Sequence, residues 1–268
     1  MIFRTKKFFS DIYNKRSVLY ELAKRDFQKQ YMGSYLGFVW VYLQPLLFIS
    51  VLYFVFTYGF RHGSGSEGVP FVVYLIAGMI SWFYIAENLN AGANVIQQHS
   101  FLLKKIDFRL SMLPIVKLMS SSVPHLFFVF ISIVVAAFHG IYPSFYILQL
   151  FYYFIAMVLL LLGFGWLTSS TNIFVPDVSK VVGIVVTFGF WLTPVFWDIA
   201  RIPEAYRWII KLNPAAYIVQ GYRDAIVNRV GFWEKPWETL YYWLFTLFIL
   251  WIGITVFKKL RPHFAEVA

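Results

Sequence analysis

Cysteine is absent from this sequence of 268 residues, and charged residues are scarce. The absence of cysteine excludes disulfide bonds, thiolate metal sites and a cysteine nucleophile. Only 13% of the residues are charged, whereas a soluble domain carries roughly 25% because its surface must face water. Hydrophobic residues make up 60% of the chain and aromatic residues 22%. This composition cannot give a globule of this size a solvated surface, so it predicts an integral membrane protein.

Motifs for chemistry are also missing. The sequence has no G-x-x-x-x-G-K-[ST] phosphate loop, no G-x-S-x-G elbow and no H-x-x-x-H spacing. The run GSGSEG at residues 63–68 fits G-x-G-x-x-G, but it lacks the preceding strand and following helix that aim backbone amides at a pyrophosphate. We interpret it as a flexible turn. The chain is therefore predicted not to be an enzyme, and to hold no metal or cofactor.

Six uncharged, apolar runs are long enough to cross a bilayer, which takes about 20 helical residues. Helices are expected because a spanning segment must satisfy its own backbone groups, and the alternating segments of a membrane barrel are absent. The sequence thus predicts an all-α polytopic membrane protein with six transmembrane helices. The predicted spans are residues 34–58, which contain Pro45, then 69–86, ended by Glu87, and 118–138, 145–167, 181–197 and 239–257.

The distribution of Lys and Arg predicts the orientation. Most of the 23 basic residues lie before the first span, between the second and third, and after the last. Positive charge favours the cytoplasm, so both termini are predicted to be cytoplasmic. The net charge of +10 is then explained by anionic lipid beside the spans, and nucleic acid is not an expected partner.

The single predicted domain, residues 1–268, therefore has five parts. They are an N-terminal cytoplasmic or interfacial helix (1–33), spans one to five (34–197), external helices (198–238), the sixth span (239–257) and a cytoplasmic tail (258–268).

Residues 17–32 form a predicted amphipathic helix in the cytoplasmic interface. Apolar residues recur at helical spacing, and basic residues take the other positions, which is typical of a helix lying on lipid headgroups. The alternative is an ordinary solvated helix leading into the first span. The apolar residues are Val18, Leu19, Leu22, Phe27 and Tyr31, and the others are Glu21, Lys24, Arg25 and Lys29.

Residues 91–113 are predicted to be a cytoplasmic loop, too polar to cross the membrane and long for a turn. A loop of this kind fits a short helix that is presented to a cytoplasmic partner. The alternative is a helical hairpin that contacts only water and headgroups.

The external segment, residues 198–235, is apolar at helical spacing but carries charges and is broken at Asn213–Pro214. Proline disfavours helix at the preceding residue, so two short helices are predicted, either dipping into the membrane from outside or lying flat on its surface. The charges are interpreted as paired surface charge rather than catalytic groups. They are Asp198, Glu204 and Asp224 with Arg201, Arg207 and Arg223.

His125 is the only histidine inside a predicted span. An ionisable residue at membrane depth is a candidate functional residue, but no acidic partner shares its span, so a hydrogen-bonded packing role is favoured. The many aromatic residues suit interfacial belts and helix packing. Those in a water-accessible path could also stack against sugar rings.

Three stretches carry a resemblance to a known family. RDFQKQYMGSYLGFVWVYLQPLL (25–47), LLKKIDFRLSMLPIVKL (102–118) and LNPAAYIVQGYRDAI (212–226) occur in this order among six predicted spans. This layout, over essentially the full length, resembles the membrane subunit of ABC-2 transporters, specifically exporters of lipid-linked polysaccharides such as O-antigen, capsule and teichoic acid.

The resemblance implies a homodimer in the bacterial inner membrane, with a path between the first and fifth spans. It also implies two cytoplasmic ATPase subunits, which would bind the ATP and Mg, and a polyprenyl-diphosphate-linked polysaccharide as substrate. Two alternatives stay open: an ABC-2 exporter of drugs or lipids, and a membrane enzyme that modifies lipid-linked sugars through Asp198, Glu204 or Asp224.

The resemblance further implies roles for three groups of residues. The predicted coupling residues, which would contact the ATPase, are Gln97, Gln98, His99, Ser100, Phe101, Leu102, Leu103, Lys104 and Lys105. The predicted headgroup and substrate-entry residues are Lys24, Arg25, Lys29 and Tyr31. The predicted external gate residues are Arg207, Asn213, Pro214, Tyr217 and Arg223.

Overall fold

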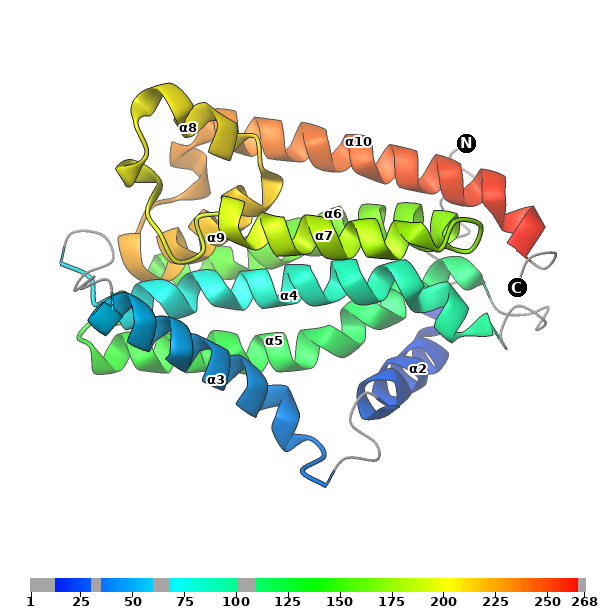
Figure 1. Ribbon diagram of the computed structural model, residues 1–268, viewed down its shortest axis with the longest axis horizontal. Coiled ribbons are helices and arrows are strands. Elements are labelled where there is room, and N and C mark those ends of the chain that lie inside the picture. Colours follow the sequence, from blue (N-terminus) through cyan, green and yellow to red (C-terminus); the bar gives the residue numbers. More distant parts are fainter. Residues whose placement is uncertain (1–12, 30–34, 60–67, 101–108, 265–268) are drawn as a thin grey trace.

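The computed structural model describes residues 13–29, 35–59, 68–100 and 109–264. Within these ranges the chain forms helices and connecting turns and no β-strand, which confirms the all-α prediction. The long helices run side by side as a bundle (Figure 1).

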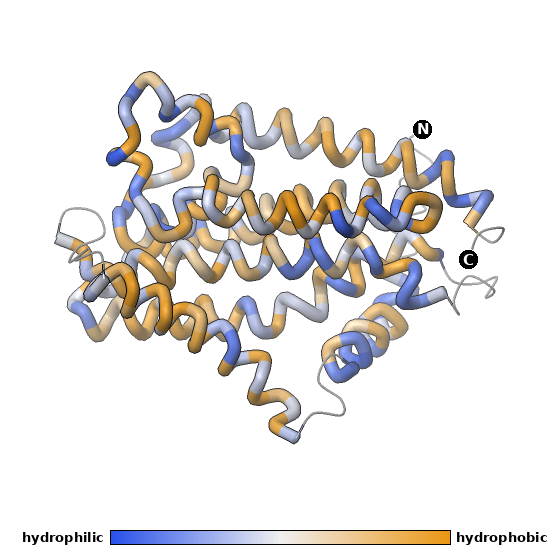
Figure 2. Tube along the Cα trace, viewed as in Figure 1, coloured by the Kyte–Doolittle hydropathy of each residue, from blue (hydrophilic) through white to orange (hydrophobic). Residues whose placement is uncertain are grey.

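Five helical stretches are long and apolar enough to cross a membrane. Apolar residues cover most of their length, as Figure 2 shows. The chain is therefore a polytopic membrane protein. The stretches comprise α3 (Val39–Phe54) continued by Val55–Gly59, α4 (Phe71–Gln98), α5 (Leu113–Phe138) preceded by Leu110–Met112, α6 (Gln149–Asn172) preceded by Phe145–Leu148, and α10 (Pro236–Leu260) followed by Arg261–His263.

The predicted fifth span differs from the helix found there. Helix α7 begins at Asp177 and ends at Leu192, so it has 16 residues, and the predicted continuation to Trp197 leaves the helix. A helix of this length rises about 24 Å, which is less than the hydrocarbon core of about 30 Å. Helix α7 still lies along α4 and α6, but its length does not support the predicted count of six spans.

Helix α4 is the central helix of the bundle, and the prediction that it ends at Glu87 was wrong. It continues to Gln98, and the partly exposed Glu87 pairs with Lys117 of α5 within the bundle. Gly92, Ala93 and Ile96 are buried in the continuation. The first part of the predicted loop 91–113 is thus a packed helix, while residues 101–108 lie outside the described residues.

Helices α6 and α10 approach closely through small residues. A Cβ atom on Gly253 of α10 would collide with the carbonyl oxygen of Gly163 in α6. A Cβ atom on Gly163 would in turn lie 2.9 Å from the backbone nitrogen of Leu250. Helices in a membrane associate through such small residues, since burial of apolar surface gains little there.

The amphipathic helix is present as α2 (Arg16–Lys29), which packs across α5. Leu19 and Ala23 are buried against Met112 and Val116. Only part of the predicted apolar face packs against α5, because Val18 is 45% exposed.

The external segment forms two helices, as predicted, with the break at Asn213–Pro214. Asn213 caps the second helix by accepting a hydrogen bond from the backbone nitrogen of Ala215 at 3.0 Å. Helix α8 (Glu204–Lys211) has no buried residue, whereas α9 (Pro214–Arg223) is inserted beside α4, α6 and α10. Each predicted alternative therefore holds for one helix. Helix α8 lies on the surface, and helix α9 is inserted into the bundle.

Candidate functional site: an aromatic groove between α3 and α7

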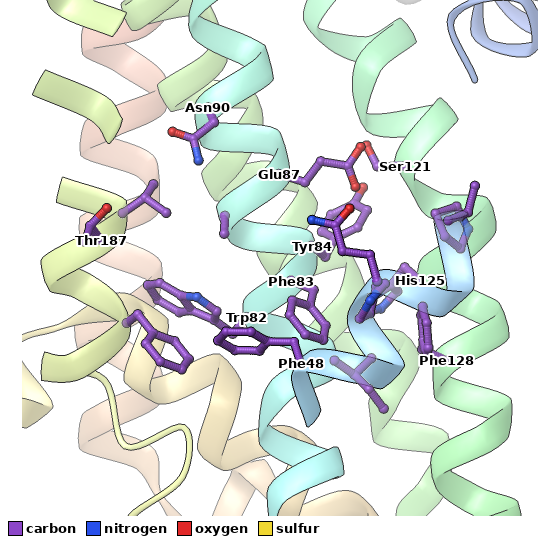
Figure 3. A pocket seen from close by; sticks show the side chains of 18 of the residues that line it. Phe48, Trp82, Phe83, Tyr84, Glu87, Asn90, Ser121, His125, Phe128 and Thr187 are labelled. Atoms are coloured by element: carbon purple, nitrogen blue, oxygen red, sulfur yellow. The ribbon is translucent and has the colours of Figure 1, made fainter. Parts of the chain in front are cut away.

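A groove of about 800 Å³ lies between α3 and α7, with α4 and α5 forming its floor (Figure 3). Phe48 of α3 and Phe190 of α7 meet with ring centroids 5.8 Å apart, so an aromatic contact joins the two walls. Phe190 also contacts Trp82 of α4 at 5.9 Å. The aromatic lining residues are Trp40, Phe48, Trp82, Phe83, Phe128, Phe190 and Trp191, with Tyr84 at the floor.

The groove has a polar end and an aromatic end. Glu87, Asn90 and Ser121 lie together at one end, while Phe48 and Trp82 lie at the other, as Figure 3 shows. The polar end lies toward the Gln98 end of α4, which is the end that the distribution of basic residues predicts to be cytoplasmic. A ligand in this groove meets hydrogen-bonding groups and aromatic faces in sequence.

An ion network ties the polar end of the groove to α2. The Lys117 ammonium, whose side chain is 4% exposed, lies 2.9 Å from Glu87 and 3.6 Å from Asp26 of α2. Ser120 donates a hydrogen bond to the same Asp26 carboxylate at 2.6 Å. Sequence reasoning missed this network because it assigned Lys117 to a loop and Glu87 to a helix end. The sequence feature that could have predicted the pair is the position of Glu87 directly after one apolar run and of Lys117 directly before the next.

His125 has the hydrogen bond that its packing interpretation predicts. Its Nε2 lies 2.8 Å from the hydroxyl of Tyr222, and its ring stacks on Phe154 with centroids 5.3 Å apart. Its Nδ1 is buried and has no hydrogen-bond partner among the described residues. Tyr222 belongs to α9, so this bond joins α5 to the inserted external helix.

The interpretation of Arg223 as a paired surface charge was wrong. Its side chain is fully buried, and it donates hydrogen bonds to the carbonyl oxygens of Tyr74 at 3.3 Å and Pro194 at 2.5 Å, and to that of Val195. Its guanidinium also lies over the Tyr74 ring, 3.6 Å from the centroid. Buried carbonyls and an aromatic face thus take the place of the expected carboxylate.

The three external carboxylates are engaged at separate places. Asp224 is also buried, against prediction, and forms an ion pair with Lys235. Glu204 forms the predicted surface pair with Arg207 at 3.4 Å, and Asp198 accepts a hydrogen bond from its own turn. Each of the three carboxylates therefore has a hydrogen-bond or ion-pair partner of its own in the structure.

The predicted gate residues separate into two groups. The first group belongs to α9 and its cap. The Asn213 amide donates to the Thr193 hydroxyl at 2.8 Å, and the Tyr217 hydroxyl lies 2.9 Å from the Thr239 hydroxyl of α10. Arg223 donates to the Pro194 carbonyl just after α7. Pro214 occupies the first turn of the same helix. Arg207, on α8, donates only within the external segment, to the carbonyls of Ile202 and Ala200 and to Glu204 among the described partners.

Those predicted coupling and headgroup residues that the structure describes lie at the end of the bundle where α4 and α10 finish and α2 lies (Figure 1). Gln97 donates to the Asn172 carbonyl of α6 at 3.1 Å, and His99 is buried beside Val95. Gln98 and Ser100 are exposed, as are the headgroup residues Lys24, Arg25 and Lys29. The remaining predicted residues, Phe101, Leu102, Leu103, Lys104, Lys105 and Tyr31, lie outside the described residues.

The sequence is similar to those of membrane transport proteins. An O-antigen export system permease protein RfbA of Klebsiella pneumoniae is 27% identical, over 93% of this chain and 94% of its own. The RfbA protein of Myxococcus xanthus with the same description is 23% identical, over 96% and 97%. The polysialic acid transport protein KpsM of Escherichia coli is 22% identical, over 88% and 91%. The family model for ABC-2 type transporters matches residues 17–227, which is most of the chain, so the chain belongs to the ABC-2 type transporter family.

Proposed function

We propose that this chain is the membrane subunit of an ATP-driven exporter that moves a lipid-linked polysaccharide, such as an O-antigen, across the bacterial inner membrane. The names of its relatives support an exported glycan. The observation that carries the proposal is the groove, which combines aromatic walls with a polar end at membrane depth.

The groove suits a sugar chain on a lipid carrier. Sugar rings have apolar faces that stack on aromatic side chains, and they have hydroxyls that need hydrogen-bond partners. Trp82 and Phe190 offer such faces, and Asn90 and Ser121 offer amide and hydroxyl groups. Repeating contacts of this modest kind allow a long chain to slide without being trapped.

A second copy of the chain completes the path in this proposal. The outer faces of α3 and α7 are apolar and exposed, for example at Val51 and Phe54 of α3 and at Ile184 and Phe188 of α7. Two copies that meet along these faces would enclose both grooves between them. The substrate would then travel between paired α3 and α7 helices.

The carrier's diphosphate headgroup would dock on α2. Lys24, Arg25 and Lys29 are exposed on this helix, and each basic residue near an anionic surface contributes about 1 kcal/mol of attraction. Asp26 on the same helix connects to Glu87 of the groove through Lys117. The docking helix and the polar end of the groove are therefore adjacent.

Two cytoplasmic ATPase subunits would supply the energy by binding ATP and Mg. The exposed residues Gln98 and Ser100 end α4 and lead into residues 101–105, which would seat on the ATPase. Both termini would lie on this cytoplasmic side. This chain itself would carry no cofactor and catalyse no reaction.

Deletion of this chain in its own host tests the proposal. We expect loss of surface polysaccharide and accumulation of the glycan on its lipid carrier inside the cell, both reversed by the wild-type chain. Trp82→Leu should complement poorly, whereas Trp251→Leu on the exposed face of α10 should complement fully. Normal surface polysaccharide in the deletion strain would refute the proposal, and a new drug sensitivity there would point to a different cargo.

A further inference from the structure

Hydrogen bonds connect both ends of the external helix α9 to the segment that follows α7. At the beginning of α9, the Asn213 side chain donates a hydrogen bond to the Thr193 hydroxyl at 2.8 Å. Thr193 is the fully buried residue that directly follows α7. At the far end of α9, Arg223 donates to the carbonyls of Pro194 and Val195, which follow directly after Thr193. The two ends of the ten-residue helix α9 thus bind the same short segment, residues 193–195.

The hydrogen bonds of Arg223 to the segment after α7 are costly to break. The fully buried guanidinium is satisfied by backbone carbonyls, and it forms no ion pair with a carboxylate among the described residues. The planar arginine fork can donate to several carbonyl oxygens at once. If α9 moved away from α7, the buried guanidinium would lose its Pro194 and Val195 acceptors, at a large cost in free energy.

Helix α4 is shaped to receive this arrangement. A Cβ atom on Gly78 would lie 2.6 Å from both the Arg223 guanidinium and the Val195 carbonyl oxygen, so only glycine leaves room for the contact. One turn earlier, the Tyr74 hydroxyl donates to the Trp197 carbonyl at 3.1 Å. The segment after α7 is therefore held from two sides.

We infer that Arg223, together with Asn213, is a positioning residue that joins α9 to the outer end of α7, so that the two helices move as one body. The inference rests on the proposed function, in which α7 is a wall of the export path and α9 belongs to the external gate. It changes how the gate works: α9 does not swing on its own hinge, and the path opens outward when α7 itself moves.

The distance between spin labels on the two helices tests the inference. The natural chain has no cysteine, so Lys180→Cys on α7 and Leu212→Cys just before α9 provide the only thiols, and both positions are exposed. Dilution with unlabelled chain keeps both labels within one subunit. We expect a narrow distance distribution by pulsed EPR in the otherwise natural chain, and a broad one after Arg223→Met.

Matched variants separate positioning from a general loss of structure. Arg207→Met removes an arginine that also donates to backbone carbonyls, but only within the external segment, so the distribution should stay narrow. Arg223→Lys, which retains the charge and fewer donors, should give an intermediate width. Thr193→Val removes the hydrogen bond between Asn213 and Thr193 without changing a charge, and it should also broaden the distance distribution. This variant provides the test if Arg223→Met does not fold. A narrow distribution in Thr193→Val and Arg223→Met would overturn the inference.

The complex with its ATPase provides the decisive comparison. The distance between the labels should be the same without nucleotide and with trapped ATP, because the two helices move together. A shift between these two states would overturn the inference. The measurements on the purified chain need neither ATPase nor substrate, so their failure is distinct from failure of the exporter proposal, which the surface polysaccharide assay tests.

Discussion

The hydroxyl of Tyr222 lies 2.8 Å from Nε2 of His125, which joins the inserted external helix to the middle of α5. Both side chains are buried, and the other imidazole nitrogen has no partner among the described residues. Tyr222→Phe would remove the partner of the buried Nε2 atom, and a buried unsatisfied polar group costs about 1–3 kcal/mol. We expect a lower melting temperature for this variant in nanodiscs. Tyr206→Phe, at an exposed tyrosine, is the control, and equal melting temperatures for both would contradict the prediction.

The Lys117 network predicts a stability loss that a surface ion pair does not show. Lys117→Met leaves Asp26 and Glu87 without their shared partner and should destabilise the chain by about 1–3 kcal/mol. Lys180→Met breaks an exposed pair with Asp177 and should change stability by less than about 1 kcal/mol. Lys117→Met combined with Asp26→Asn and Glu87→Gln should restore part of the loss in a thermal shift assay, because no carboxylate is then left without its partner. If this triple variant is no more stable than Lys117→Met, the pairing is not the cause.

The contact between α6 and α10 predicts a strong effect of one methyl group. Gly253→Ala places a Cβ atom against the Gly163 carbonyl and should cost about 1–3 kcal/mol, since packed helices give way only by shifting. Gly183→Ala is the matched helical control, because the nearest atom to its new Cβ lies 3.9 Å away. Thermal unfolding in nanodiscs compares the two variants. A Gly253→Ala chain as stable as Gly183→Ala would show that the helices separate without cost.

The groove predicts that export depends on Phe190. Phe190→Ala removes aromatic contacts to Phe48 and Trp82, each worth about 0.5–1.5 kcal/mol. We expect less surface polysaccharide at an unchanged amount of chain in the membrane, measured by immunoblot. Phe248→Ala, on the exposed face of α10, should leave export unchanged. Equal export by both variants would exclude the groove as the path.

The predicted orientation can be tested with single thiols, because the natural chain has none. Glu204→Cys on α8 should react with a membrane-impermeant maleimide added to intact spheroplasts. Gln98→Cys at the end of α4 should react only after the membrane is permeabilised. Labelling of Gln98→Cys from outside would reverse the assignment, and residues 97–105 would then be inaccessible to a cytoplasmic ATPase.

Local patterns allowed most helices to be predicted, and the break between α8 and α9 is the clearest case. Asn213 and Pro214 stop one helix and cap the next through their own backbone chemistry, so the sequence alone suffices there. Long uncharged runs similarly predicted α3, α5, α6 and α10. These features depend on residues within one or two turns of each other.

Distant partners explain what could not be predicted. Glu87 looked like the end of a helix because its partner, Lys117, lies 30 residues away on α5. Arg223 looked like a surface charge because Asp224 follows it, whereas its real acceptors are carbonyls 28, 29 and 149 residues away. The early end of α7 belongs to the same group, because the carbonyls of Pro194 and Val195, just after the helix, accept hydrogen bonds from Arg223 much later in the chain. Only the folded arrangement of several helices reveals these partners.

The continuity of α4 has a mechanical consequence. Its 28 residues form one uninterrupted rod of about 42 Å, without a proline, from the neighbourhood of Arg223 past the polar end of the groove to Gln98. A push delivered at Gln98 reaches Tyr74 without passing through a joint. In the proposed exporter, a force applied at Gln98 would therefore be transmitted along α4 to the end of the bundle that holds Arg223.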